Sequence, residues 1–115
     1  MALIYHLTDT DAWESARPTG EYAAPSLADE GFIHCSKDIP QLLKVAARLY
    51  PGETNLLVLD VDLDKLTAPL KNERSRSGEV YPHIYGKLNV GAVVRERALK
   101  VDAGGGHYLE DGPGS

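Results

Sequence analysis

The chain has 115 residues, enough for one domain and too few for two. Hydrophobic residues make up 43% of it and charged residues 25%, a balance typical of a globular protein, which excludes an intrinsically disordered chain. Seventeen acidic and twelve basic residues leave a formal charge of −5, so we expect no dominant surface for bulk RNA or DNA. Cys35 is the only cysteine, which excludes an intramolecular disulfide and a cysteine-rich metal cluster.

The distribution of apolar residues gives no sign of membrane association. No run approaches the roughly 18 consecutive apolar residues that a membrane-spanning helix needs. The first residues lack the basic start and apolar stretch of a secretory signal. We therefore expect a cytoplasmic protein with no membrane partner.

Two strands and a helix are predicted in the first third of the chain. Residues 3–7 are apolar and β-prone, with His6 near the end of this predicted strand. Apolar residues at helical spacing follow in residues 12–16, and the helix should end at the next proline. Glycine and proline mark residues 18–26 as a loop, and residues 32–36 predict a second buried strand.

The middle of the chain has the clearest pattern. Asp38 and Gln41 have capping-box spacing and precede an apolar stripe of helical period that ends before Pro51. Residues 56–61 are almost continuously apolar, which predicts a central strand that is buried on both faces. Three alternating aspartates at its exit are interpreted as solvated turn residues, namely Asp60, Asp62 and Asp64.

The remainder has fewer signals. Residues 72–79 are predicted to be a polar loop, and the valines of residues 92–101 favour a last strand over a helix. Residues 103–115 contain five glycines and one proline. We therefore expect one domain over residues 1–102, followed by a flexible glycine-rich tail over residues 103–115.

Three of the four histidines lie in short segments with apolar neighbours, at His6, His34 and His83. If the predicted strands pair, these histidines should line one cleft, where neutral imidazole suits acid–base work or ligand recognition. The alternative is that each histidine is a half-buried strand residue with a satisfied hydrogen bond.

A metal site is not expected. Neighbouring residues of a strand point to opposite faces, so His34 and Cys35 should not share one ion, and no His-x-x-x-His or Cys-x-x-Cys spacing occurs. The same alternation directs Cys35 into the core when His34 faces the cleft.

Two histidines each precede a hydroxyl residue by two positions, in His6-Leu7-Thr8 and His34-Cys35-Ser36. Residues i and i+2 of a strand share a face, so each pair would present an imidazole and a hydroxyl side by side to a ligand. Thr8 and Ser36 are also suited to capping the helices that follow them. Both roles are compatible.

Three segments together resemble a small bacterial family of unknown function, domain family 952. They are Ile4-Tyr5-His6-Leu7, residues 30–36 (Glu-Gly-Phe-Ile-His-Cys-Ser) and residues 82–89 (Pro-His-Ile-Tyr-Gly-Lys-Leu-Asn). That family is similar in fold to the ADP-ribosyltransferases, which bind NAD between two small antiparallel sheets. The resemblance implies a compact α+β domain with two small, mainly antiparallel sheets and a few flanking helices.

The resemblance also implies a ligand and a set of site residues. NAD, or a related nucleotide, would be the substrate, and the ligand-binding residues would be His6, Thr8, Ser36, Tyr85 and Asn89. His34 or His83 would act as base toward an incoming hydroxyl, and Glu73 would stabilise the positive charge that develops on the ribose as nicotinamide leaves. The alternative function is a non-catalytic module that binds a nucleotide-like small molecule on the same fold.

Overall fold

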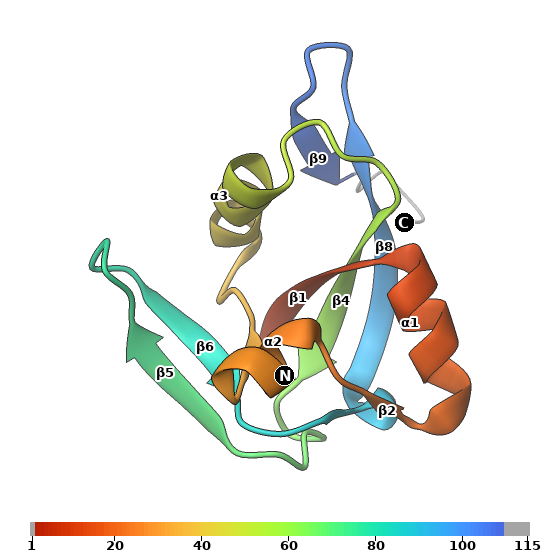
Figure 1. Ribbon diagram of the computed structural model, residues 1–115, viewed down its shortest axis with the longest axis vertical. Coiled ribbons are helices and arrows are strands. Elements are labelled where there is room, and N and C mark those ends of the chain that lie inside the picture. Colours follow the sequence, from red (N-terminus) through yellow and green to blue (C-terminus); the bar gives the residue numbers. More distant parts are fainter. Residues whose placement is uncertain (1, 110–115) are drawn as a thin grey trace.

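The computed structural model describes residues 2–109 as one α+β domain with antiparallel sheets (Figure 1). The helices are α1 (Thr10–Ala16), α2 (Pro25–Glu30) and α3 (Ile39–Leu49), with short 3-10 turns at Arg17–Thr19 and Val90–Ala92. The strands are β1 (Leu3–Asp9), β2 (Glu21–Tyr22), β3 (Ile33–His34), β4 (Leu56–Asp62), β5 (Leu70–Arg74), β6 (Val80–Ile84), β7 (Leu88–Asn89), β8 (Val93–Val101) and β9 (His107–Leu109). No helix among residues 2–109 is long and apolar enough to cross a membrane.

The largest sheet has four strands in the order β1-β4-β8-β9. β4 lies between two neighbours and is buried along almost its whole length, which confirms the predicted central strand. A three-stranded sheet has the order β3-β6-β5, and β2 pairs with β7. All of these strand pairs are antiparallel.

One short bridge joins the two larger sheets. The Tyr5 N–H donates to the Ser36 carbonyl at 2.9 Å, and the Ser36 N–H donates back to the Tyr5 carbonyl at 2.7 Å. Tyr5 lies in β1, and Ser36 follows β3 by two residues. This bridge places the segment after β3 beside β1, so that His6 and His34 become neighbours although they are far apart in sequence.

Helices cover both sides of the four-stranded sheet (Figure 1). Asp38 caps α3 by accepting a hydrogen bond from the Gln41 N–H at 2.8 Å, as the spacing predicted. The buried face of α3 packs against Leu56, Val58 and Leu99. On the other side, Trp13 of α1 is 1% exposed within the main core, which also includes residues of β3, β4 and β6.

Two expectations for polar segments are wrong. Asp60 and Asp62 lie in β4 and are buried, whereas Asp64 lies in the turn that was expected. β8 supplies basic partners for Asp60: Arg95 Nε and Arg97 Nη2 contact its carboxylate at 3.1 and 2.8 Å, while Asp62 accepts a hydrogen bond from the Asp64 N–H. The loop predicted at residues 72–79 is shorter, because β5 continues to Arg74 and forms a hairpin with β6. A polar sequence on an edge strand with one exposed face carries little strand signal.

Two boundaries also differ from expectation. The predicted second strand at 32–36 contains only two strand residues, and His34 is exposed. After residue 102, the chain turns at the glycines and adds β9 to the edge of β8, whereas the sequence placed the end of the folded domain at residue 102. Residues 110–115 of the predicted tail lie outside the described residues.

Candidate functional site

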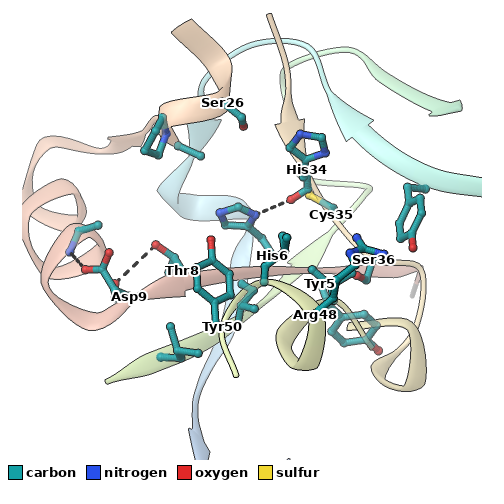
Figure 2. Close-up of a pocket in the computed structure, with 18 of the residues that line it drawn as sticks. Tyr5, His6, Thr8, Asp9, Ser26, His34, Cys35, Ser36, Arg48 and Tyr50 are labelled. Carbon is teal, nitrogen blue, oxygen red and sulfur yellow. Dashed lines mark hydrogen bonds between the residues drawn. The ribbon is translucent and has the colours of Figure 1, made fainter. Parts of the chain in front are cut away.

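A pocket of about 580 Å³ opens between β1, the segment after β3 and the C-terminal half of α3 (Figure 2). Its walls are mainly apolar and include Leu7, Val45 and Leu56. Its polar lining includes His6, Thr8, Ser36, Arg48 and Tyr50, together with the carboxylates of Asp9 and Glu53. A largely apolar cavity of this size with a few polar groups is typical of a small-molecule site.

His6 is the centre of a buried hydrogen-bond chain along this pocket. Its Nδ1 lies 2.6 Å from the backbone carbonyl oxygen of His34 (Figure 2). Its Nε2 lies 2.8 Å from the Tyr22 hydroxyl. The Tyr22 and Thr8 hydroxyl oxygens are 2.8 Å apart. A carbonyl oxygen only accepts, so Nδ1 carries the proton and Nε2 accepts from the phenol.

Burial keeps His6 neutral. Desolvation lowers the pKa of His6 to about 4, against the opposing effect of its hydrogen bond to the His34 carbonyl. Burial similarly raises the pKa of Tyr22 to about 12. We call the part of the lining formed by His6, Thr8 and Tyr22 the inner wall of the pocket. It is therefore uncharged at neutral pH, and both ring nitrogens of His6 are occupied by protein groups.

His34 and His83 form the rim of the same pocket. They are register partners on β3 and β6, and their ring centroids are 5.2 Å apart. Each histidine has a carboxylate partner: His34 Nε2 lies 2.9 Å from Glu30 Oε2, and His83 Nδ1 lies 2.8 Å from Glu73 Oε1. The rim therefore carries two imidazole–carboxylate pairs, whereas the imidazole of His6 has only uncharged partners.

The predicted site residues fall into two groups. All three histidines line one pocket, and Thr8 and Ser36 line it with them. Cys35 is buried in the main core, as alternation predicted, and it also contributes to the pocket wall; burial raises the pKa of its thiol.

Glu73, Tyr85 and Asn89 lie outside the pocket lining. The Tyr85 hydroxyl donates to Glu73 Oε1 at 2.5 Å, next to the bond from His83. The Asn89 side chain instead holds a loop: its oxygen accepts from the N–H and hydroxyl of Thr67, and its nitrogen donates to the Lys65 carbonyl. Glu73 therefore reaches the pocket through His83 and does not face it directly.

The sequence prediction missed several lining residues, among them Tyr22, Arg48 and Tyr50. Tyr22 lies in the segment predicted to be a loop, Arg48 lies outside the apolar stripe of α3, and Tyr50 follows that helix. The contact between Tyr22 and His6 depends on the packing of β2 against β1, which local patterns do not encode. Within residues 2–109, no group of three or more His, Cys, Asp or Glu side chains is arranged to hold a metal ion.

Comparisons with known proteins place this architecture in a family. Residues 7–96 match the family described as protein of unknown function (DUF952). The crystal structure of protein CC0527 from Caulobacter crescentus is 39% identical, with a TM-score of 0.81 over 92% of this chain and 93% of that chain. The solution NMR structure of CC0527 is 36% identical, with a TM-score of 0.79 over 92% and 91%. No curated protein matches the chain. The chain therefore belongs to the DUF952 family, as its three sequence segments predicted.

Proposed function

We propose that this protein binds a small nucleotide-like molecule, NAD or a relative of it, in the pocket between β1 and α3. The observation that carries the proposal is the convergence of His6, Thr8 and Ser36, from two separate segments, on one cavity of about 580 Å³. Ligand cavities of about 300–1,000 Å³ are usual for molecules of this size. The mainly apolar wall would hold a planar ring, and the few hydroxyls would orient a sugar.

The pocket also offers a cation. Arg48 lines it, and within residues 2–109 it has no ion-pair partner. A guanidinium group binds phosphate oxygens through paired hydrogen bonds. Tyr5, Tyr50 and Tyr81 line the same cavity and supply aromatic surface for a base. A ligand with a ring, a sugar and a phosphate would use all of these features.

An ADP-ribosyltransferase-like fold, which the sequence resemblance implied, would favour a nucleotide as the ligand, with one change in the role of His6. Both ring nitrogens of His6 are already engaged, by the His34 carbonyl and the Tyr22 hydroxyl. His6 would therefore orient Tyr22 and Thr8, and the hydroxyls of Thr8 and Ser36 would contact the ribose.

The test is a titration of the full chain with NAD, ADP-ribose, AMP and unrelated metabolites, followed by calorimetry and amide chemical shifts. We expect binding of at least one nucleotide, with the largest shifts at residues of β1 and α3. Ser36→Ala should weaken that binding, and Ser15→Ala, at an exposed serine of α1 outside the pocket lining, is the matched control. Failure of every nucleotide to bind would contradict the proposal.

A second candidate is a transferase that uses NAD as substrate. The observation that favours it is the pair of histidines on the rim, each with a carboxylate partner, beside the proposed nucleotide pocket. Cleavage of NAD would release nicotinamide, which chromatography detects directly. Binding of NAD without release of nicotinamide, with any acceptor tried, would leave the binding module as the function.

A further inference from the structure

His83 is held in one orientation by contacts on three sides. Its Nδ1 lies 2.8 Å from Glu73 Oε1, and its ring stacks on Phe32 with centroids 4.1 Å apart. The His34 ring lies nearly perpendicular to it, with centroids 5.2 Å apart. Its side chain is 13% exposed, and it lines the pocket. The ring therefore has little freedom to turn, and part of it remains accessible from the pocket.

The tautomer of His83 follows from its partner. An ionised carboxylate only accepts hydrogen bonds, so Nδ1 carries the proton and Nε2 has a free lone pair. Nε2 makes no hydrogen bond within the described part of the chain. His34 has the opposite arrangement: Glu30 engages its Nε2, which leaves Nδ1 as its free nitrogen. The two histidines differ in burial, because the His34 side chain is 53% exposed and the His83 side chain is 13% exposed. Of the two rim histidines, His83 is thus the one that is largely shielded from bulk solvent beside the pocket.

Glu73 is itself fixed as an anion. Hydrogen bonds from Tyr85, and then from His83, hold the pKa of its carboxyl below the ordinary value. Lys71 also favours the ionised form, and its Nζ lies 4.7 Å from the centre of the Tyr85 ring. The titratable groups around His83 are therefore Glu73 and Lys71 on β5, Tyr85, which shares Glu73 with His83, and the His34–Glu30 pair.

We propose that His83 is a general base that activates a water or hydroxyl group against an electrophile held in the pocket, and that Glu73 is a positioning residue that acts through it. The proposal rests on the proposed function insofar as the electrophile is a ligand of that pocket. Nε2 would take the proton of the hydroxyl as its oxygen bonds to the electrophilic carbon. The leaving group would depart with the electron pair of the broken bond, and the proton would then pass from His83 to solvent. The carboxylate would stabilise the imidazolium that forms in between.

The experiment uses 4-nitrophenyl acetate as a probe, a small neutral ester that needs no contact with Arg48. Water would add to its carbonyl carbon, the C–O bond to the nitrophenyl group would break, and release of nitrophenolate would be followed by absorbance. His83→Asn is the sharp variant, because the amide nitrogen of Asn replaces Nδ1 toward Glu73 while the Nε2 lone pair is lost. We expect His83→Asn to lower the rate about tenfold or more. His107→Gln, on β9 and outside the pocket lining, should match the wild type.

The role of Glu73 is read from the pH profile of the same reaction. Glu73→Gln removes the negative charge beside the imidazolium, so the apparent pKa of the rate should fall, and Glu73→Asp should restore part of the shift. A merely structural role for Glu73 would change the rate without moving this pKa.

Equal rates of ester hydrolysis for wild type and His83→Asn would overturn the proposal. A loss of rate in His34→Asn as large as that in His83→Asn would also overturn it. Titration with NAD distinguishes this proposal from the proposed function. If NAD binds but ester hydrolysis does not depend on His83, only the proposal for His83 is overturned. If hydrolysis depends on His83 but no nucleotide binds, only the proposed function is overturned.

Discussion

The Nδ1 atom of His6 donates a hydrogen bond of 2.6 Å to the backbone carbonyl of His34, across 28 residues of sequence. This bond lies beside the backbone bridge between Tyr5 and Ser36, so the side chain and the main chain join β1 to the segment after β3 together. The inner wall of the pocket is built on that junction. His6 is therefore as much a structural residue as a candidate site residue.

Replacement of His6 tests this structural role. His6→Ala would leave the His34 carbonyl and the Tyr22 hydroxyl without their buried partner, and it would open a cavity. We expect the free energy of unfolding to fall by about 2–4 kcal/mol. Urea denaturation measures the change. The control is His107→Ala, which removes a more exposed ring and should cost less than about 1 kcal/mol. Equal losses in the two variants would contradict the prediction.

Stability should also depend on pH through His6. Its pKa is about 4 in the folded protein and 6.5 in the reference state, so between these values the unfolded chain binds a proton that the folded chain does not. The contribution of His6 is thus complete above pH 6.5 and is lost as the pH falls toward 4, by about 1.4 kcal/mol per pH unit and about 3 kcal/mol in all. Urea denaturation of wild type and His6→Asn between pH 4.5 and pH 7.5 checks this. A profile for His6→Asn as steep as that of the wild type would rule out His6 as the cause.

The buried carboxylate of Asp60 gives a third prediction. Its side chain is 1% exposed and contacts two arginines, of which Arg97 is 11% exposed and Arg95 is 45% exposed. Asp60→Asn removes the charge that compensates Arg97 inside the fold and should cost about 3–5 kcal/mol. Arg95→Ala breaks the more solvated contact and should cost less than about 1 kcal/mol. Thermal or urea denaturation of both variants measures the two losses of stability. A larger loss of stability in Arg95→Ala than in Asp60→Asn would contradict the prediction.

Local patterns predicted those elements whose signal lies within a few residues. The cap at Asp38, the stripe that follows it and the apolar run of β4 gave α3 and the central strand, because periodicity and capping are properties of short segments. Strand alternation likewise predicted that His6 and Thr8 share a face, and both line the pocket. These are the parts of the fold and of the site that one sequence is able to specify.

Contacts between distant segments were not predictable in the same way. Asp60 is buried because the register of β4 and β8 places Arg95 opposite it, and Glu73 meets His83 only because β5 extends into a hairpin with β6. Such pairings depend on which strands become neighbours, and a one-residue change of register would exchange the faces. Charged residues after an apolar run therefore looked like a turn although they belong to the strand.

The net charge of −5 predicts weak binding of bulk nucleic acid. Nonspecific affinity depends on cations that neutralise successive phosphates, and an acidic chain with scattered basic residues offers few such contacts. A gel shift with random RNA and DNA duplexes at physiological salt should show no complex at micromolar protein. Tight binding that weakens steeply with added salt would contradict the prediction.

Arg48 gives the last prediction, which concerns the charge of the ligand. Its guanidinium is the positively charged group of the pocket lining, so the proposed nucleotide should owe part of its affinity to a contact between Arg48 and phosphate. Arg48→Gln should weaken the binding of NAD and ADP-ribose about tenfold, equivalent to about 1.4 kcal/mol, while the affinity for adenosine, which has no phosphate, should stay the same. The matched control is Lys44→Gln, a cation on the same helix whose side chain is 70% exposed and outside the pocket lining. Calorimetry at two salt concentrations adds an independent reading, because the loss of one ion pair should reduce the salt dependence of NAD binding in Arg48→Gln and not in Lys44→Gln. A uniform loss of affinity for adenosine and NAD would show that Arg48 shapes the pocket and does not bind phosphate.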